Sequence, residues 1–129
     1  MVSLDASDLH LTVGSSPVVR IKRNLSPLSE FPAMTTEDVT SFLQQVLEPD
    51  QMSVLEVSRE LDFSVSLGSK ARFRVNAFYQ KGYPSVALRY IPQIIPSLDE
   101  LNLPPILKGL SNLKQGLVLV TGPTGHGKS

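Results

Sequence analysis

Apolar and polar residues alternate in several short stretches of the chain, a pattern typical of half-buried strands. Near the N-terminus, Leu9, Leu11 and Val13 alternate with polar residues. A turn signal follows at Gly14–Pro17, and Val18–Arg23 has the composition of a returning strand. The chain is therefore predicted to open with a β-hairpin.

Three further stretches, Leu61–Leu67, Arg72–Tyr79 and Val86–Ile91, follow one another with short glycine-containing turns between them. They predict an antiparallel meander. The two faces of the middle stretch differ in character, with Phe73, Val75 and Ala77 on one side and Arg72, Arg74 and Asn76 on the other. One face of the predicted sheet is thus apolar and the other polar.

The region between the hairpin and the meander predicts helices. Thr35 is a good N-cap, and Glu37 and Asp38 place negative charge in the first turn. Apolar residues then recur at helical spacing, at Val39, Phe42, Leu43, Val46 and Leu47. Such a stripe favours core packing over a cofactor or partner groove. Pro49 ends this helix and starts a shorter one that reaches about Arg59.

Prolines punctuate the segment after the meander, at Pro92, Pro96, Pro104 and Pro105. Because proline is depleted from helix and sheet interiors, we expect an extended linker here. A short helix is expected over Ile106–Leu113, and Leu117–Thr121 has the composition of a compact apolar strand. The fold class predicted for the whole chain is α/β, more narrowly α+β.

Composition narrows the functional classes. The 129 residues include 12 Lys and Arg against 12 Asp and Glu, so no bulk attraction to nucleic acid is expected. Disulfides and thiolate metal sites are excluded because the sequence has no cysteine, which fits a cytoplasmic location. The first residues carry no signal-peptide pattern, and the apolar runs are too short to span a bilayer.

The last eight residues match G-x-x-x-x-G-K-[ST] at every fixed position, the pattern of a Walker A phosphate-binding loop. They are Gly122, Pro123, Thr124, Gly125, His126, Gly127, Lys128 and Ser129. The glycines let backbone N–H groups curl around phosphate oxygens, Lys128 brings a positive charge to the β and γ phosphates, and Ser129 offers its hydroxyl to Mg²⁺. The sequence therefore predicts binding of ATP with Mg²⁺.

Histidine and arginine side chains leave alternatives open. His126 sits at a variable position of the loop and is interpreted as a tolerated polar residue rather than a catalytic base. Arg72 and Arg74 share a strand face, and Arg89 lies on the next strand, so the three side chains can converge across an antiparallel pair. A solvated sheet face and a phosphate-binding patch both fit this spacing.

With these residues in view, the chain resembles the PilT-type twitching-motility ATPases, within the secretion ATPase superfamily. The segments that carry the resemblance run in family order along nearly the whole chain: Ala6–Leu11, Pro17–Ile21, Glu60–Ser64, Arg72–Phe78, Ala87–Pro92 and Gly116–Ser129. The chain departs from the family at Lys22-Arg23-Asn24, where members tend to have Asp-Gly.

The resemblance implies a PAS-like domain over residues 1–92, a linker with a short helix over 93–115, and the start of a RecA-like ATPase domain over 116–129. It also implies a homo-hexamer that hydrolyses ATP to retract a pilus, with an inner-membrane pilus platform protein as partner and a cytoplasmic or peripheral inner-membrane location. Arg74 and Arg89 match family arginines that reach toward nucleotide.

The chain is expected to be a fragment that is inactive alone, because Walker B and later motifs are not among the 129 residues. Its status as an enzyme is therefore left open. Two alternative functions stay beside pilus retraction. One is an assembly ATPase of the same superfamily, and the other is a non-catalytic PAS-like interaction module.

Overall fold

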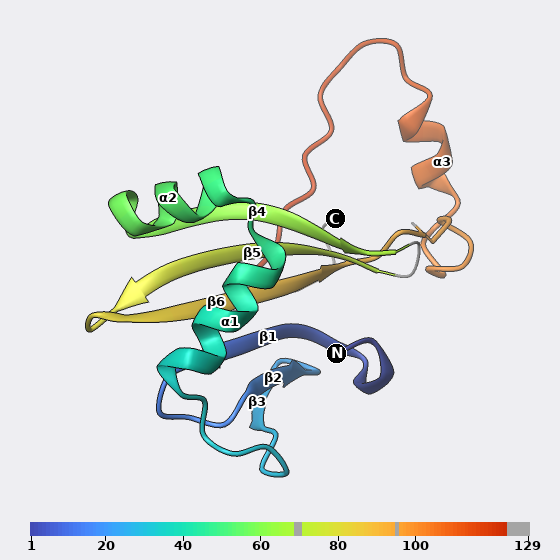
Figure 1. Cartoon of the computed structure of the whole chain (residues 1–129). Helices are drawn as coiled ribbons and strands as arrows, with labels where there is room; N and C mark the ends of the chain where they lie inside the picture. Colours follow the sequence, from blue (N-terminus) through green and yellow to red (C-terminus); the bar gives the residue numbers. More distant parts are fainter. Residues whose placement is uncertain (69–70, 95, 124–129) are drawn as a thin grey trace. The chain divides into compact units, whose positions relative to one another are not determined.

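A six-stranded antiparallel sheet organises the first part of the molecule, with strand order β3-β2-β1-β6-β5-β4 (Figure 1). The computed structural model describes residues 1–68, 71–94 and 96–123. They fall into two compact units, Met1–Gln93 and Ile94–Ser129. The strands are β1 (Ala6–Thr12), β2 (Val18–Ile21), β3 (Asn24–Pro27), β4 (Glu60–Leu67), β5 (Ala71–Gln80) and β6 (Tyr83–Ile91). The predicted α+β class is confirmed.

The predicted hairpin is present but is followed by a strand that the sequence did not reveal. β2 ends at Ile21 rather than Arg23, because Lys22 and Arg23 adopt positive φ angles of 46° and 76° and form a tight turn. β3 then pairs antiparallel with β2. Its four residues end in Pro27, which an edge strand tolerates. Such a short stretch has too few residues to display a clear alternation.

The predicted meander is confirmed, with β4 paired to β5 and β5 to β6. Its connection to the N-terminal hairpin is the pairing of β1 with β6, in which Leu9 lies opposite Leu88 and Leu11 opposite Val86. The first and last strands of the unit are therefore neighbours at the centre of the sheet. The hairpin and the meander form one continuous sheet.

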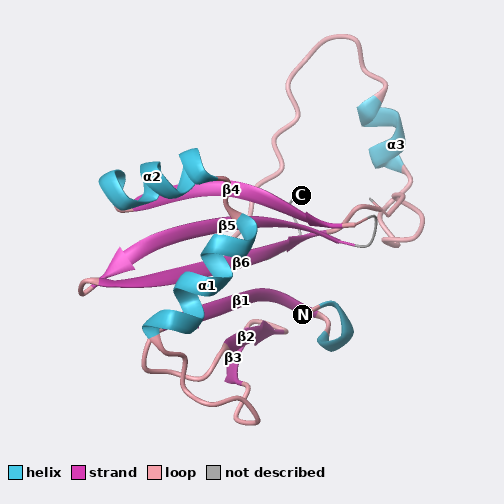
Figure 2. Ribbon diagram, viewed as in Figure 1, coloured by secondary structure: helices cyan, strands magenta, loops and turns pink. Residues whose placement is uncertain are grey.

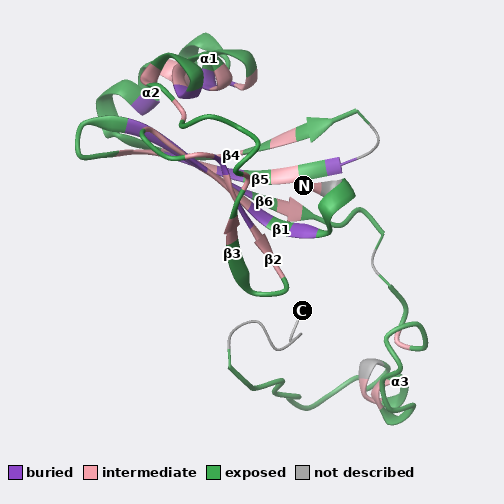
Figure 3. Cartoon of the chain, turned by 90° about the horizontal axis from the view of Figure 1, so that it is seen from below, coloured by how far each residue is buried: buried purple, intermediate pink, exposed green. Residues whose placement is uncertain are grey.

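Two helices, α1 (Thr36–Val46) and α2 (Pro49–Ser58), lie over the same face of this sheet (Figures 2 and 3). Thr35 is the N-cap of α1, as the sequence predicts, and the structure adds a reciprocal capping box between Thr35 and Asp38. Val39 and Leu43 of α1 are 0% and 1% exposed. The core beneath the helices comprises Leu11, Val39, Leu43, Leu47, Leu55, Val75, Ala77, Val86 and Leu88. The interpretation of the apolar stripe as core packing is confirmed.

The second unit contains α3 (Ile106–Ser111), a helix that the sequence predicts but that ends two residues earlier than expected. The strand predicted at Leu117–Thr121 is wrong, since these residues form no strand and the side chains of Leu117 and Leu119 are 82% and 73% exposed. A strand needs a neighbour to satisfy its backbone groups, and the described residues of this unit supply none.

Replacing a core residue should cost far more than replacing an exposed apolar residue of the neighbouring helix. Leu43→Ala is expected to lower the free energy of unfolding by roughly 2–5 kcal/mol, because it opens a cavity at the centre of the core. The control is Val57→Ala, at a side chain 85% exposed, which should change that free energy by less than about 0.5 kcal/mol. Urea unfolding followed by circular dichroism measures both, and equal losses would contradict this placement of the core.

The β2–β3 turn stores strain that asparagine should relieve. Lys22→Asn is expected to raise the free energy of unfolding by about 0.5–1 kcal/mol, since asparagine tolerates the left-handed backbone better than lysine does. Lys114→Asn, at a position outside the left-handed region, serves as the control and should be neutral. A loss of stability on Lys22→Asn, measured by the same urea unfolding, would show that the lysine side chain itself stabilises the turn.

Candidate functional site

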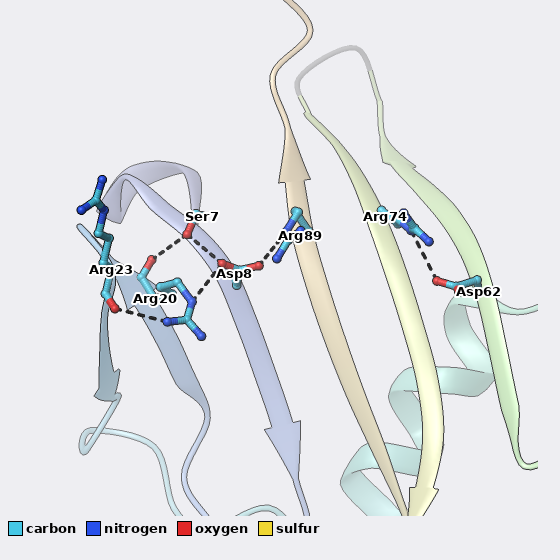
Figure 4. A network of polar contacts seen from close by, with 7 residues as sticks. All are labelled: Ser7, Asp8, Arg20, Arg23, Asp62, Arg74 and Arg89. Carbon is cyan, nitrogen blue, oxygen red and sulfur yellow. Dashed lines mark hydrogen bonds and ion pairs between the residues drawn. The ribbon is translucent and has the colours of Figure 1, made fainter. Parts of the chain in front are cut away.

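A row of charged side chains crosses the sheet on the face opposite α1 and α2 (Figure 4). The strand register places Asp8 of β1 directly between Arg20 of β2 and Arg89 of β6, and Arg89 directly opposite Arg74 of β5. Residues opposite each other in adjacent strands project to the same face. The register therefore brings three arginines and one aspartate into a single line.

Asp8 is the centre of this row. Its Oδ1 lies 2.9 Å from Nε of Arg89, and its Oδ2 lies 3.2 Å from Nε of Arg20. The Ser7 hydroxyl donates a further hydrogen bond to Oδ2, at 2.8 Å. The Asp8 side chain is only 10% exposed. One nearly buried carboxylate thus bridges arginines from the strands on either side of it.

The environment of Asp8 stabilises its charged form. Burial on its own raises the pKa of this carboxyl group. The hydrogen bonds from Ser7 and Arg89, together with the positive charges of Arg89 and Arg20, outweigh burial and lower the pKa below its ordinary value of 3.8. Asp8 is therefore ionised at neutral pH and supplies a fixed negative charge to both arginines.

Arg74 and Arg89 face each other across β5 and β6, an arrangement that ordinarily destabilises a sheet. Arg74 is compensated by Asp62 of β4, with 3.4 Å between Nε and Oδ1, but both side chains are more than half exposed. An ion pair this exposed contributes little in water. The two guanidinium groups therefore form a solvent-facing positive pair suited to an anion.

A shallow depression of about 420 Å³ lies beside these groups and is lined by residues of β1, β4, β5 and β6, among them Asp8, His10, Asp62, Arg74 and Arg89. His10 contributes a buried Nε2 that has no hydrogen-bond partner among the described residues. Within that same part of the chain, no three His, Asp or Glu side chains gather into a group able to hold a metal. The depression is thus lined by two arginines and by carboxylates, alongside the apolar residues Ala87 and Leu88.

The structure places only part of the predicted site. It brings Arg74 and Arg89 together on one face, and Arg72 lies one row away on that face with its Nη2 3.3 Å from Ser64 Oγ. Gly122 and Pro123 are exposed residues of the second unit. The other predicted loop residues, Thr124, Gly125, His126, Gly127, Lys128 and Ser129, lie outside the described residues.

Sequence reasoning missed Asp8 and Arg20. A faint signal was present, because aspartate is depleted from strands and Asp8 interrupts an otherwise favourable one. The decisive fact is that β1 lies between β2 and β6. It brings together Asp8 and Arg89, which are 81 positions apart in the sequence, and a local sequence pattern cannot predict such a contact.

No protein-family model matches the chain. It is 37% identical over 124 residues, or 96% of its length, to the type IV pilus retraction ATPase PilT of Pseudomonas aeruginosa. It is also 37% identical over its full length to the type IV pilus ATPase PilU of the same organism, and 38% identical over 88% of its length to a twitching motility protein of Neisseria gonorrhoeae. The chain spans about a third of the length of these curated relatives. It covers 36% of PilT, 34% of PilU and 30% of the twitching motility protein.

Solved structures give the same relationship. A crystal structure of the pilus retraction motor PilT with bound ADP superposes with a TM-score of 0.80 and 42% identity, covering 98% of this chain and 37% of that one. The ATPase DotB of Legionella pneumophila superposes with a TM-score of 0.75 at 24% identity, over 95% of this chain and 35% of its own, which supports the fold. None of the helices in the described parts of the chain has the length and apolar character needed to span a bilayer.

The stability contributed by Asp8 should depend on pH with a defined sign. Because its native pKa is lowered, the contribution is complete well above 3.8 and is lost as the pH falls through the native pKa. Asp8→Asn is therefore expected to be less stable than the wild type at pH 7, and the difference should narrow below about pH 4. Urea unfolding across this range measures the gap, and a gap that stays constant down to pH 2.5 would contradict the assignment.

Proposed function

Because the chain belongs to the PilT-type family of twitching-motility ATPases, we propose that it forms part of a motor that hydrolyses ATP to retract type IV pili. The proposal rests above all on one observation: 98% of the chain superposes, at 42% identity, on a pilus retraction motor that has ADP bound. The complete match of Gly122–Ser129 to the Walker A pattern points to the same chemistry.

In this proposal, Gly122–Ser129 holds the phosphates of ATP. Backbone N–H groups of the glycine-rich loop donate to phosphate oxygens, and Lys128 neutralises charge on the β and γ phosphates. Ser129 would supply a hydroxyl ligand to Mg²⁺, and the ion, when bound, would neutralise negative charge on the phosphates. The chain's own contribution here is to bind and orient the phosphates.

Arg74 and Arg89 are proposed to contact the nucleotide phosphates as well. Each bonds its carboxylate through Nε, which leaves N–H groups of the two terminal nitrogens to bond another acceptor. Guanidinium groups pair well with phosphate oxygens, and a cation near the γ-phosphate lowers the barrier to its transfer. An anion bound between Arg74 and Arg89 would also reduce the repulsion between their positive charges, because the two residues lie opposite each other.

The organisation of the complete protein follows from the same relationship. We propose a PAS-like domain at residues 1–92, a linker at 93–115 and the start of a RecA-like domain at 116–129. The complete protein would act as a homo-hexamer in the cytoplasm, in contact with a pilus platform protein at the inner membrane.

The full-length gene product tests this function. Lys128→Ala should reduce ATP hydrolysis to background, and Arg74→Gln or Arg89→Gln should lower kcat at least about tenfold, because the transferred phosphate loses a stabilising cation. Lys81→Gln, which removes a positive charge from the β5–β6 turn, is the control and should leave kcat unchanged. Absence of hydrolysis by the unsubstituted protein would overturn the ATPase assignment and favour a non-catalytic interaction module. Hydrolysis that survives Lys128→Ala would show that it does not arise at the proposed phosphate-binding loop.

A cell assay separates retraction from assembly. Cells whose copy carries Lys128→Ala should keep their surface pili and lose twitching, since pili that cannot be retracted still extend. Loss of the pili themselves, seen by electron microscopy, would instead assign the motor to pilus assembly.

A further inference from the structure

We propose that Asp8 is a positioning residue, an anchored carboxylate that holds the guanidinium of Arg89 by its Nε so that the terminal nitrogens face an incoming phosphate. This inference rests on the proposed function, because it assumes that Arg89 meets nucleotide phosphates. It adds to the proposed phosphate site Asp8 of β1 and the two residues that hold Asp8 in place, Ser7 and Arg20.

The carboxylate is fixed from one side. Oδ2 of Asp8 accepts a hydrogen bond from Ser7 Oγ and is paired with Nε of Arg20. Arg20 is itself held at its other end, where its Nη1 donates to the backbone carbonyl oxygen of Arg23 at 3.2 Å. With Oδ2 engaged in this way, Oδ1 is directed to Arg89 (Figure 4). A nearly buried group with three partners has little freedom to turn.

Among the described residues, one side-chain ion pair holds the guanidinium of Arg89. Its Nε donates to Asp8 Oδ1 at 2.9 Å, and its side chain is otherwise 72% exposed. A guanidinium has five N–H donors, and this bond uses one. The terminal nitrogens of Arg89 make no hydrogen bond to the described residues of the chain. The contact therefore restrains a long side chain and leaves its bidentate edge available to phosphate oxygens.

The neighbouring arginine has a much weaker restraint. Arg74 meets Asp62 at 3.4 Å, and the Asp62 side chain is 52% exposed against 10% for Asp8. Asp62 has no anchors comparable to Ser7 and Arg20 among the described residues. Of the two facing arginines, Arg89 is therefore the one whose orientation is set before a ligand arrives.

Electrostatics alone predicts the opposite effect of removing Asp8. Asp8→Asn deletes a negative charge from a basic face, which by itself should strengthen anion binding. If Asp8 positions Arg89, the same substitution should weaken binding, because the anion must then order a free side chain. The direction of the change separates a positioning residue from a simple counter-ion.

The test uses inorganic tripolyphosphate and the 129-residue chain, with Lys128→Ala present throughout so that the lysine of the Walker A loop adds no charge to the binding and the loop's backbone contribution is the same in every variant. Isothermal titration should show binding roughly threefold to tenfold weaker for Asp8→Asn, the range expected for ordering one long side chain. Asp5→Asn is the matched control. It makes the same chemical change at an exposed position with φ of 51°, which asparagine tolerates, and binding should be unchanged or slightly tighter.

A spectroscopic measurement on the unsubstituted side chains supports the titration. In an NMR spectrum of arginine-labelled chain, the Nε–H proton of Arg89 should exchange with water more slowly than that of Arg72, and Asp8→Asn should abolish the difference. Backbone spectra check that the variant is folded. Should Asp8→Asn fail to fold, the comparison of Arg89 with Arg72 in the wild type decides, and equally fast exchange overturns the proposal.

Two further variants separate this inference from the function on which it rests. If Arg89→Gln leaves tripolyphosphate binding unchanged, the proposed phosphate contact of Arg89 fails. If Arg89→Gln weakens binding while folded Asp8→Asn binds equally well or better, only the positioning role fails. If the phosphate contact of Arg89 and the positioning role of Asp8 are both correct, adding Asp8→Asn to the Arg89→Gln variant should not weaken tripolyphosphate binding further.

Discussion

The pairing of β1 with β6 is the contact on which the rest of the first unit depends. Without it, the N-terminal hairpin and the meander would be separate pieces, and small isolated hairpins are marginal in water. The pairing places Leu11 opposite Val86 in the core beneath the helices, and on the other face of the sheet it places Asp8 opposite Arg89. One ladder of backbone hydrogen bonds therefore completes the core and assembles the charged row.

The two faces of the sheet follow from the period-2 geometry of strands, and they serve different purposes. Val75 is fully buried under the helices, while its neighbour Arg74 projects to the open face. The core holds the strands in register, and the register sets which charges meet. A one-residue slip of β6 would expose Leu88 and turn Arg89 into the core, so the hydrophobic effect indirectly specifies the position of the guanidinium group.

The charged row shows how a sheet carries like charges at close range. Arg74 and Arg89 repel each other, and each has a carboxylate on its outer side. Only Asp8 is buried and anchored, which gives the row an ordered end at β1 and a looser end at β4. If the row binds phosphate, as proposed above, a cation oriented in advance lowers the entropy lost on binding, while a looser neighbour adapts to the anion.

The local sequence determined much of this molecule. Alternation located β1, β4 and β5, the order of the meander located β6, and Thr35 as N-cap located α1. The glycine spacing at the end of the chain predicts a phosphate-binding loop. Alternation also put Arg74 on the polar face. Local pattern failed at β3, too short to show a period, and at Leu117–Thr121, where apolar composition suggested a strand without a neighbour to pair with. Only the tertiary structure placed β1 beside β6 and made Asp8 the partner of Arg20 and Arg89, because strand order depends on contacts between distant residues that jointly bury the core.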